Sequence, residues 1–220
     1  GKSTLLRTAC GLLQPSEGQV LLDGEPLPSL AHKAVARKLA FLPQSRPVPD
    51  LTARRLVLHG RFPYLGYPRR YSKADYAAAD VALAAVGAQA LAERDLQALS
   101  GGERQKVFLA MALAQDAPTI LLDEPTTYLD IDRQFEVMRL LAKLRAQGKT
   151  VVAVLHDLPL AFHFADRVVL LRAGAIEADG TPDAVANSGA LARAFRVAAH
   201  RIEVPGFGAQ YVFYPLERSL

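Results

Sequence analysis

The sequence predicts an α/β fold with a mainly parallel sheet and a helical insertion between two of its strands. Short apolar runs without alternation, at residues 120–122 and 150–155, are typical of strands that are buried on both faces. Such runs alternate along the chain with helix-like segments, and this alternation favours a parallel sheet. Residues 45–99 contain no convincing buried strand, so we expect them to form a helical subdomain.

The elements before this subdomain follow from local patterns. Residues 3–10 have helical spacing, and Gly11 is placed to end that helix. Residues 19–22 predict a strand that enters a turn, residues 31–39 predict a helix, and residues 40–42 predict a short strand before a proline. The last of these strands flanks the helical subdomain on its N-terminal side.

Helical patterns dominate the middle of the chain. One helix is expected near residues 51–61, two within the alanine-rich residues 71–98, and another over residues 103–115 after a Ser-Gly-Gly break. Residues 131–146 predict an amphipathic helix that joins the two buried strands.

The remaining chain predicts smaller elements. Residues 158–165 have helical spacing, and residues 168–178 read as a hairpin around Arg172-Ala173-Gly174. Residues 190–220 are less regular, and we expect them to form a C-terminal extension with a few short strands.

Composition excludes several classes of protein. The 220 residues are half apolar and 22% charged, which fits one packed domain and not a disordered chain. The net charge of +4 is spread along the sequence, so we expect no nucleic-acid partner. No apolar stretch is long enough to span a bilayer, so work at a membrane requires a docking partner. One basic cluster, which we interpret as a solvated face, comprises Arg54, Arg55, Arg61, Arg69 and Arg70.

The chain opens on Gly1-Lys2-Ser3-Thr4, which matches the end of the phosphate-binding pattern G-x-x-x-x-G-K-[ST]. Backbone N–H groups at a helix start hold phosphate oxygens, and glycine lets the backbone approach them closely. Lys2 is expected to reach the β- and γ-phosphates of ATP, and Ser3 to bind Mg²⁺. Because the pattern begins upstream and the first residue is not Met, we expect residues 1–220 to be a domain that is incomplete at its N-terminus.

Two acids, Asp123 and Glu124, follow the buried strand at residues 120–122. The C-terminal ends of parallel strands deliver functional side chains to one edge of a sheet. Asp123 is therefore expected to hold Mg²⁺ through water, beside Ser3. Glu124 is expected to position or deprotonate the water that attacks the γ-phosphate. A solvated acidic turn is the alternative, and the phosphate-binding motif upstream disfavours it.

A second candidate anion site lies at residues 99–105, with the sequence LSGGERQ. A serine caps a helix well and glycines permit close approach, whereas an ordinary cap needs no glycine pair. This motif resembles the signature motif of ABC ATPases. The resemblance implies a P-loop NTPase fold and a head-to-tail dimer, in which the motif of one subunit closes on the ATP of a second copy. The residues expected to make that contact are Ser100, Gly101, Gly102 and Glu103.

Further positions match this family in order, so the resemblance implies roles for them. Gln44 resembles the Q-loop glutamine, which contacts Mg²⁺ and senses the attacking water. Asp130 resembles the D-loop aspartate that reaches across the dimer, and it also suits a helix N-cap. His156 resembles the switch histidine that contacts the γ-phosphate, so Glu124 and His156 form the expected catalytic pair.

A finer resemblance concerns the cargo. GRFPY at residues 60–64, TTYLDI at residues 126–131 and LHDL at residues 155–158 are similar to segments of ATPases from iron–siderophore, haem and cobalamin importers. The resemblance implies an ATP-hydrolysing subunit that powers the uptake of such a metal chelate, with the iron–siderophore group as the best match.

Other assignments share part of this pattern. An ABC ATPase of another transport system, of DNA repair or of translation has the same motifs. The DNA-repair class has a long coiled coil and the translation class a second tandem domain, and the sequence displays neither. A P-loop kinase or GTPase lacks the motif at residues 99–105. An inactive regulatory paralogue is disfavoured by Glu124 and His156.

The resemblance also implies partners and a location. The partners are a second copy of the chain, a membrane permease and, indirectly, a substrate-binding protein, at the cytoplasmic face of the inner membrane. We expect residues 45–70 to dock the permease, because they follow Gln44 and are rich in proline, arginine and aromatic residues. Arg61 and Tyr64 are expected to take part in this contact.

Overall fold

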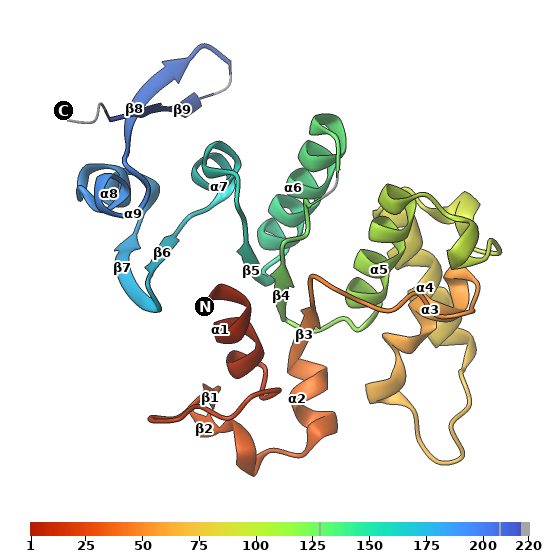
Figure 1. Ribbon diagram of the computed structural model, residues 1–220. Helices are drawn as coiled ribbons and strands as arrows, with labels where there is room; N and C mark the ends of the chain where they lie inside the picture. The colour runs from red at the N-terminus through yellow and green to blue at the C-terminus, as the bar shows by residue number, and fades with distance from the viewer. Residues whose placement is uncertain (128, 207, 217–220) are drawn as a thin grey trace. The chain divides into compact units, whose positions relative to one another are not determined.

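The computed structural model describes residues 1–127, 129–206 and 208–216 (Figure 1). Contacts divide the chain into two compact units: one is Ser3–Val154, and the other joins the chain from Leu155 onward with Gly1 and Lys2. Within the described ranges, no helix is both long enough and apolar enough to cross a membrane.

A three-stranded parallel sheet forms the centre of the unit Ser3–Val154. Its strands are β3 (Leu39–Leu42), β4 (Thr119–Asp123) and β5 (Thr150–Val154), with β4 in the middle (Figure 1). The register pairs Asp123 at the end of β4 with Val154 at the end of β5. β4 is buried over most of its length, as its unbroken apolar run predicts. The predicted α/β fold with a parallel sheet is therefore confirmed.

Two helices contact the strands of this sheet. α1 (Lys2–Ala9) buries Leu6 against Leu121 of β4 and Val154 of β5. α6 (Ile131–Ala146) connects β4 to β5 and has the bounds that the sequence predicts. Its buried residues recur at helical spacing on one face and are Val137, Met138, Leu141 and Leu144.

A small hairpin and one helix precede β3. β1 (Leu21–Leu22) and β2 (Glu25–Pro26) pair across Asp23 and Gly24, whose φ angles are 54° and 84°. Positive φ at both central residues is what a tight two-residue hairpin turn requires. α2 (His32–Lys38) then leads directly into β3.

The segment between β3 and β4 is helical. α3 (Ala53–His59), α4 (Lys73–Ala85) and α5 (Gly101–Ala114) contact one another (Figure 1). The 3-10 turns Phe62–Tyr64, Gln89–Leu91 and Leu96–Ala98 complete the segment.

The prediction of two helices within residues 71–98 is wrong. α4 ends before Gly87, which has a φ of 65°, and the residues beyond it form short 3-10 turns. Their backbone groups bond to the start of α3 instead of to a helix of their own. Arg94 O accepts from Ala53 N at 3.0 Å, and Ala92 O accepts from Arg54 N at 2.8 Å.

Arg61 is an internal side chain of this insertion and not part of a solvated face. Its side chain is 14% exposed, and it donates to Asp75 Oδ1 at 3.1 Å and to Ala114 O at 2.8 Å. Its guanidinium carbon lies 4.0 Å from the ring centroid of Tyr64, and the Tyr64 hydroxyl donates to Gln115 O at 3.0 Å. Arg61 and Tyr64 therefore tie the turn after α3 to α4 and to the end of α5.

The other arginines of the predicted basic cluster differ from one another. Arg54 pairs with Asp80 and, at 2.6 Å, with Glu93, so it links α3 to α4 and to the turn that follows. Arg55, Arg69 and Arg70 are exposed, as a solvated face requires. Of the five arginines, Arg61 thus forms an internal ion pair, Arg54 forms surface ion pairs, and the other three face solvent.

The chain from Leu155 onward packs around Phe162, which is 2% exposed. The elements in order are α7 (Leu158–Phe164), the hairpin β6 (Val168–Arg172) and β7 (Ala175–Gly180), α8 (Pro182–Asn187), α9 (Ala190–Phe195), and the hairpin β8 (Val197–Val204) and β9 (Gly208–Pro215). The rings of Tyr211 and Phe213 on β9 meet the Phe162 ring edge-on, with centroids 5.3 and 5.2 Å away. The predicted hairpin at residues 168–178 is confirmed, and the expected short strands form one hairpin of two eight-residue strands.

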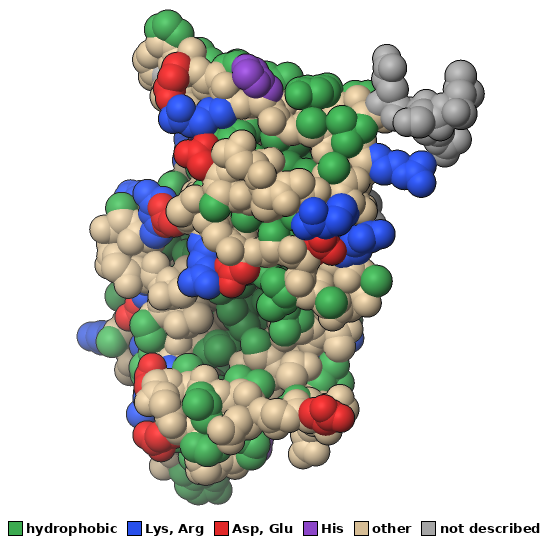
Figure 2. Space-filling model, turned by 90° about the vertical axis from the view of Figure 1, so that its left-hand side faces the viewer, with side chains coloured by type: hydrophobic (Ala, Val, Ile, Leu, Met, Phe, Trp, Pro, Cys, Tyr) green, Lys and Arg blue, Asp and Glu red, His purple; other side chains and the backbone are tan. Residues whose placement is uncertain are grey.

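Charges are mixed on the face that Figure 2 displays. Basic and acidic side chains alternate there, with hydrophobic side chains between them. Within the C-terminal unit, Arg167 pairs with Asp179 and Arg193 with Glu177. A nucleic-acid surface usually concentrates unpaired basic side chains in a stripe, and this face has no such arrangement.

Candidate functional site

The start of α1 contacts the end of β4 through Ser3 and Asp123. Ser3 Oγ donates to Asp123 Oδ1 at 3.1 Å. Asp123 is 2% exposed, and its buried Oδ2 has no hydrogen-bond partner among the described residues. A buried carboxylate oxygen is costly unless a hydrogen bond or a cation satisfies it. A hydroxyl beside a carboxylate is the oxygen donor set that Mg²⁺ prefers, so these residues fit the expected ion.

No cluster of three or more His, Cys, Asp or Glu side chains that could hold a metal occurs in the described part of the chain. Mg²⁺ is ordinarily bound by one or two protein groups, with water and substrate phosphates as the other ligands. The Ser3–Asp123 pair therefore suits an ion that arrives with a nucleotide better than an all-protein metal cage.

The remaining residues of the phosphate-binding motif surround Ser3 in the chain. Lys2, Ser3 and Thr4 occupy the first turn of α1, and Gly1 precedes it. The first N–H groups of a helix have no partners within the helix, so they are available to an anion. The motif thus coincides with a helix start, which is the local structure that phosphate binding requires.

Glu124 follows β4 and has a φ of +56°, which non-glycine residues rarely adopt. Its Oε2 accepts hydrogen bonds from Gln44 Nε2 at 2.5 Å and from Thr127 Oγ1 at 3.0 Å. Strained backbone of this kind persists where neighbouring contacts hold it, and it clusters at functional sites. The described contacts therefore bring Ser3, Asp123, Glu124 and Gln44 to one edge of the sheet.

Three side chains near Glu124 escaped the sequence reasoning. Thr127 donates to the Glu124 carboxylate, as described above. Gln105 Nε2 donates to Pro125 O at 2.8 Å, and Arg46 Nη2 donates to Gln105 Oε1 at 2.6 Å. Gln105 could have been found from the sequence, because it belongs to the LSGGERQ motif. Arg46 could not, because it lies in a proline-rich loop that matches no motif.

Ser100 caps α5 through a reciprocal pair of hydrogen bonds. Its Oγ accepts from Glu103 N at 3.3 Å, and Glu103 Oε2 accepts from Ser100 N at 2.8 Å. The hydrogen bonds from Ser100 lower the pKa of the Glu103 carboxyl. In this structure the Glu103 carboxylate therefore holds the helix start together.

Neither Gly101 nor Gly102 is required by the packing of the described chain. A Cβ on Gly101 meets nothing within 4 Å, and a Cβ on Gly102 has its nearest contact, Arg133 Nη1, at an ordinary 3.5 Å. Both residues have helical backbone, so their φ angles do not require glycine either. The described chain therefore gives neither a packing reason nor a backbone reason for glycine at these two positions.

Asp130 and His156 lie at the starts of two further segments. Asp130 is the N-cap of α6 and accepts from Arg133 N at 3.0 Å, which confirms the predicted cap. His156 is two residues beyond Val154, the residue that pairs with Asp123 in the sheet. Its proposed contact with phosphate stays a prediction. Tyr128, quoted above within TTYLDI, lies outside the described residues.

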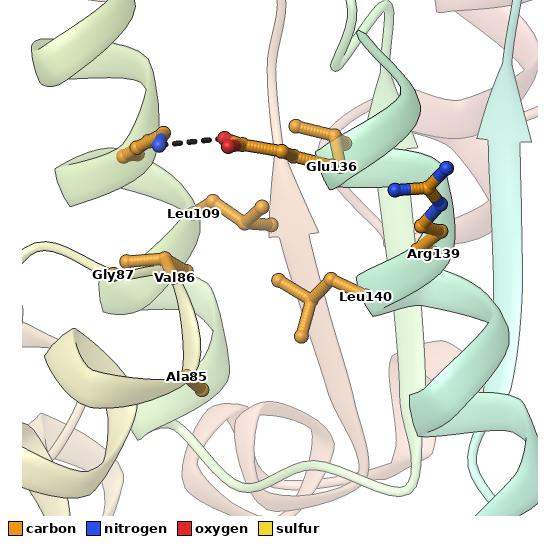
Figure 3. Close-up of a pocket in the computed structure, with 9 residues that line it drawn as sticks. Ala85, Val86, Gly87, Leu109, Glu136, Arg139 and Leu140 are labelled. Atoms are coloured by element: carbon orange, nitrogen blue, oxygen red, sulfur yellow. Dashed lines mark ion pairs between the residues drawn. The ribbon is translucent and has the colours of Figure 1, made fainter. Parts of the chain in front are cut away.

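A separate hollow lies between the end of α4, α5 and α6, and Figure 3 shows Leu109 and Leu140 pointing into it. Glu136 reaches across it to Lys106, with 2.7 Å between the charged atoms. None of the predicted site residues lines this hollow. The Ser3–Asp123–Glu124 edge is therefore the better candidate for chemistry.

Comparison with known proteins gives consistent matches. The family model described as ABC transporter matches residues 1–127. Petrobactin import ATP-binding protein FpuD of Bacillus anthracis is 45% identical over 210 residues, which cover 94% of this chain and 77% of that protein. Achromobactin transport ATP-binding protein CbrD of Dickeya dadantii is 43% identical, with 94% and 78% covered. Hemin import ATP-binding protein HmuV of Nocardia farcinica is 45% identical, with 96% and 73% covered.

Solved structures agree with these sequence matches. A transporter described as metal-chelate type, in an inward-facing conformation, superposes with a TM-score of 0.82 at 28% identity, covering 100% of this chain and 83% of the other. An ATP-binding cassette solved as a dimer with ADP and Pi superposes with a TM-score of 0.71 at 31% identity, covering 83% and 81%. The family match, the relatives and the fold lead to one conclusion: this chain belongs to the ABC transporter family.

Proposed function

We propose that this chain is the ATP-hydrolysing subunit of an ABC importer for an iron–siderophore or a related metal chelate such as haem or cobalamin. The observation that carries the hydrolytic part is the Ser3–Asp123 contact beside Glu124, whose carboxylate is held by Gln44 and Thr127. The cargo class rests on relatives at 45% and 43% identity that are named for petrobactin import and achromobactin transport.

The proposed chemistry assigns one task to each group. Gly1, Lys2 and Thr4, with the first backbone N–H groups of α1, bind the phosphates of ATP. Ser3 and Asp123 would hold Mg²⁺, Asp123 through water, and the ion when bound would neutralise charge on the phosphates. Glu124 orients the attacking water and accepts its proton. Gln44 contacts the Glu124 carboxylate and would also contact the ion. His156 contacts the γ-phosphate.

A second copy of the chain completes each ATP site in this proposal. Ser100, Gly101 and Gly102 present a helix start that has no lysine or Mg²⁺ ligand of its own, so the phosphate it meets belongs to the partner. Glu103 supports that helix start by capping it, and Asp130 faces the partner. The solved relative with ADP and Pi is itself a dimer.

A membrane permease couples hydrolysis to transport, with a substrate-binding protein acting indirectly and the subunit lying at the cytoplasmic face of the inner membrane. Burial narrows the proposed dock from residues 45–70 to residues 66–70. Arg61 and Tyr64 are occupied by internal contacts, whereas residues 66–70 are all exposed and Tyr67 is fully exposed. We call residues 66–70 the docking loop.

The alternative function is an ABC ATPase of another system, such as DNA repair or translation. A DNA-repair ATPase binds a polyanion, and the paired charges of Arg167, Arg193 and Arg201 offer it little. The 45% identity with a petrobactin import ATP-binding protein over 94% of the chain favours the importer.

Uptake into vesicles tests this proposal. The full-length protein is reconstituted with its permease and binding protein, and uptake of a radiolabelled ferric siderophore is measured with internal ATP. We expect ATP-dependent uptake in the wild type, its loss in Glu124→Gln, and normal uptake in the control Glu25→Gln on exposed β2. ATP hydrolysis without uptake of any metal chelate overturns the cargo assignment. Absence of ATP hydrolysis overturns the assignment as an ATP-hydrolysing subunit.

A further inference from the structure

The loop between β3 and α3 carries Gln44 and is rich in proline. Proline has no backbone N–H, so such a loop makes few backbone hydrogen bonds of its own. Side-chain hydrogen bonds hold it at two points, from Gln44 to Glu124 and from Arg46 to Gln105. The first point belongs to the hydrolytic site, and the second has no role in the function proposed above.

Arg46 is partly buried against α5. Its Nη2 donates to Gln105 Oε1 at 2.6 Å, and its guanidinium carbon lies 4.4 Å from the ring centroid of Phe108. Burial lowers the pKa of Arg46 to about 10, so the group remains charged at neutral pH. Placing a charged group away from water is costly. A surface loop does not need such a group simply to remain folded.

Gln105 links Arg46 to the backbone that follows Glu124. A guanidinium can only donate hydrogen bonds, so Arg46 selects the orientation in which the amide oxygen of Gln105 faces it. The amide nitrogen then faces Pro125 O, to which it donates at 2.8 Å. With the amide reversed, two oxygens would face each other at Pro125. Arg46 thus determines which end of the Gln105 amide meets the backbone after Glu124.

Pro125 O is the backbone carbonyl of the residue that follows Glu124, and Glu124 has a φ of +56°. A hydrogen bond at this carbonyl helps to hold a backbone conformation that is otherwise disfavoured. The same conformation directs the Glu124 carboxylate toward Gln44 and Thr127. The chain of contacts from Arg46 through Gln105 therefore ends at the carboxylate that acts on water.

We propose that Arg46 is a positioning residue for ATP hydrolysis, which acts by fixing the Gln105 amide and so the backbone that presents Glu124. The inference rests on the proposed function, because it requires Glu124 to act on the attacking water. The contacts that carry the proposed role of Arg46 are those with Gln105 and Phe108, and in this assignment it does not bind the nucleotide. Its removal should therefore slow the chemical step and leave nucleotide binding nearly intact.

Steady-state ATP hydrolysis by the full-length protein with its permease tests the proposal. In Arg46→Met, which keeps an aliphatic stem over Phe108, kcat should fall about tenfold while KM stays within about twofold. Arg46→Lys keeps one donor for Gln105 Oε1 and should recover part of kcat. The matched control is Arg54→Met, which removes an ion-paired arginine of the same insertion and should leave kcat unchanged.

A second variant tests the hydrogen bond from Gln105 to Pro125 O separately from the hydrogen bond between Arg46 and Gln105. Gln105→Glu keeps an acceptor for Arg46 but replaces the donor to Pro125 O, so its kcat should fall as in Arg46→Met. The double variant Arg46→Met/Gln105→Glu should be no slower than Gln105→Glu alone, because both changes break one path.

Three results would overturn this role. They are an unchanged kcat in Arg46→Met, a fall in kcat matched by an equal fall in the folded fraction from thermal unfolding, and multiplicative losses in the double variant. The result is separable from the proposed function. If the wild type hydrolyses ATP and Glu124→Gln does not, the hydrolytic assignment stands whatever Arg46→Met does.

Discussion

Asp75 is a buried acid that organises the helical insertion. Its side chain is 9% exposed, and its Oδ2 accepts from Ser72 N at 2.9 Å and Ser72 Oγ at 2.7 Å. Its Oδ1 accepts from Arg61 Nε at 3.1 Å. Burial raises the pKa of Asp75, but the hydrogen bonds from Ser72 and Arg61 together outweigh it and lower the pKa below its usual range. The charged carboxylate therefore stabilises both the cap of α4 and the position of Arg61.

This lowered pKa makes part of the stability dependent on pH. The folded pKa lies below the unfolded value, so the contribution is present above about pH 4 and is lost as pH falls through the folded pKa. Asp75→Asn should lower the free energy of unfolding by about 1–3 kcal/mol at pH 7, and this difference should shrink as pH drops below 4. Urea unfolding followed by circular dichroism at each pH measures it.

The exposed Asp50→Asn serves as the control for Asp75 and should match the wild type throughout. A constant difference between wild type and Asp75→Asn from pH 7 down to pH 2.5 would contradict the assignment, because a titrating carboxylate must lose its advantage once protonated.

At this scale the sequence indicates some groups and not others. The sequence places Ser3 at a helix start and Asp123 and Gln44 at the ends of two strands. The contacts among the described residues join Ser3 to Asp123 and Gln44 to Glu124. No sequence pattern singles out Arg46, because its contact with Gln105 depends on how a proline-rich loop packs against a helix distant in sequence. Arg61 misled the sequence reasoning for the same reason: its partner Asp75 becomes its neighbour only after folding.

Among the elements, α5 contacts both other helices of the insertion and starts at the proposed partner site. Its first turn has two glycines: a Cβ on Gly101 would meet nothing within 4 Å, and a Cβ on Gly102 would make only ordinary contacts. Near its C-terminal end it meets Gly60, where a Cβ would lie 2.2 Å from Met111 O and 3.0 Å from Gln115 N. Glycine is thus needed at residue 60 for packing inside the chain. At residues 101 and 102 packing gives no such reason, and the proposed contact with the ATP of a second copy supplies one.

Two alanine substitutions should therefore behave in opposite ways. Gly60→Ala forces α3 and α5 apart and should cost about 1–3 kcal/mol of unfolding free energy, measured by urea titration. Gly102→Ala should not destabilise the fold and should slightly favour helix. In a Glu124→Gln background it should abolish the ATP-dependent dimer on a sizing column. A stable Gly60→Ala protein, or a normal dimer with Gly102→Ala, would contradict this division.

Element boundaries were predictable where one helix makes all its own hydrogen bonds. α6 keeps its predicted bounds: Asp130 caps its start, and its buried apolar residues recur at helical spacing from Val137 to Leu144. The alanine-rich segment after α4 was misread because its helical spacing continues past Gly87. In the structure the backbone of Ala92 and Arg94 bonds to residues at the start of α3, and no local pattern reveals such tertiary hydrogen bonds.

For the whole molecule, the docking loop is the surface that we propose contacts the permease. Tyr67→Ser with Arg70→Glu should reduce co-purification with the permease and cargo uptake, while ATPase activity of the isolated subunit survives. The matched control, Arg55→Glu with Val81→Ser, changes exposed residues of α3 and α4 and should have little effect. Unchanged co-purification and uptake in the docking-loop variant would place the dock elsewhere.

The central claim is that Glu124 acts on the water that hydrolyses ATP, and a single-turnover measurement tests it most directly. Excess full-length protein is mixed with limiting radiolabelled ATP and Mg²⁺, and phosphate release is followed for the wild type and for Glu124→Gln. The variant keeps Ser3, Asp123 and the start of α1, so it should bind ATP normally. Loss of a general base costs about a hundredfold or more in rate, and the account predicts a fall of that size. A single-turnover rate within about threefold of the wild type, with ATP bound equally well, would contradict it.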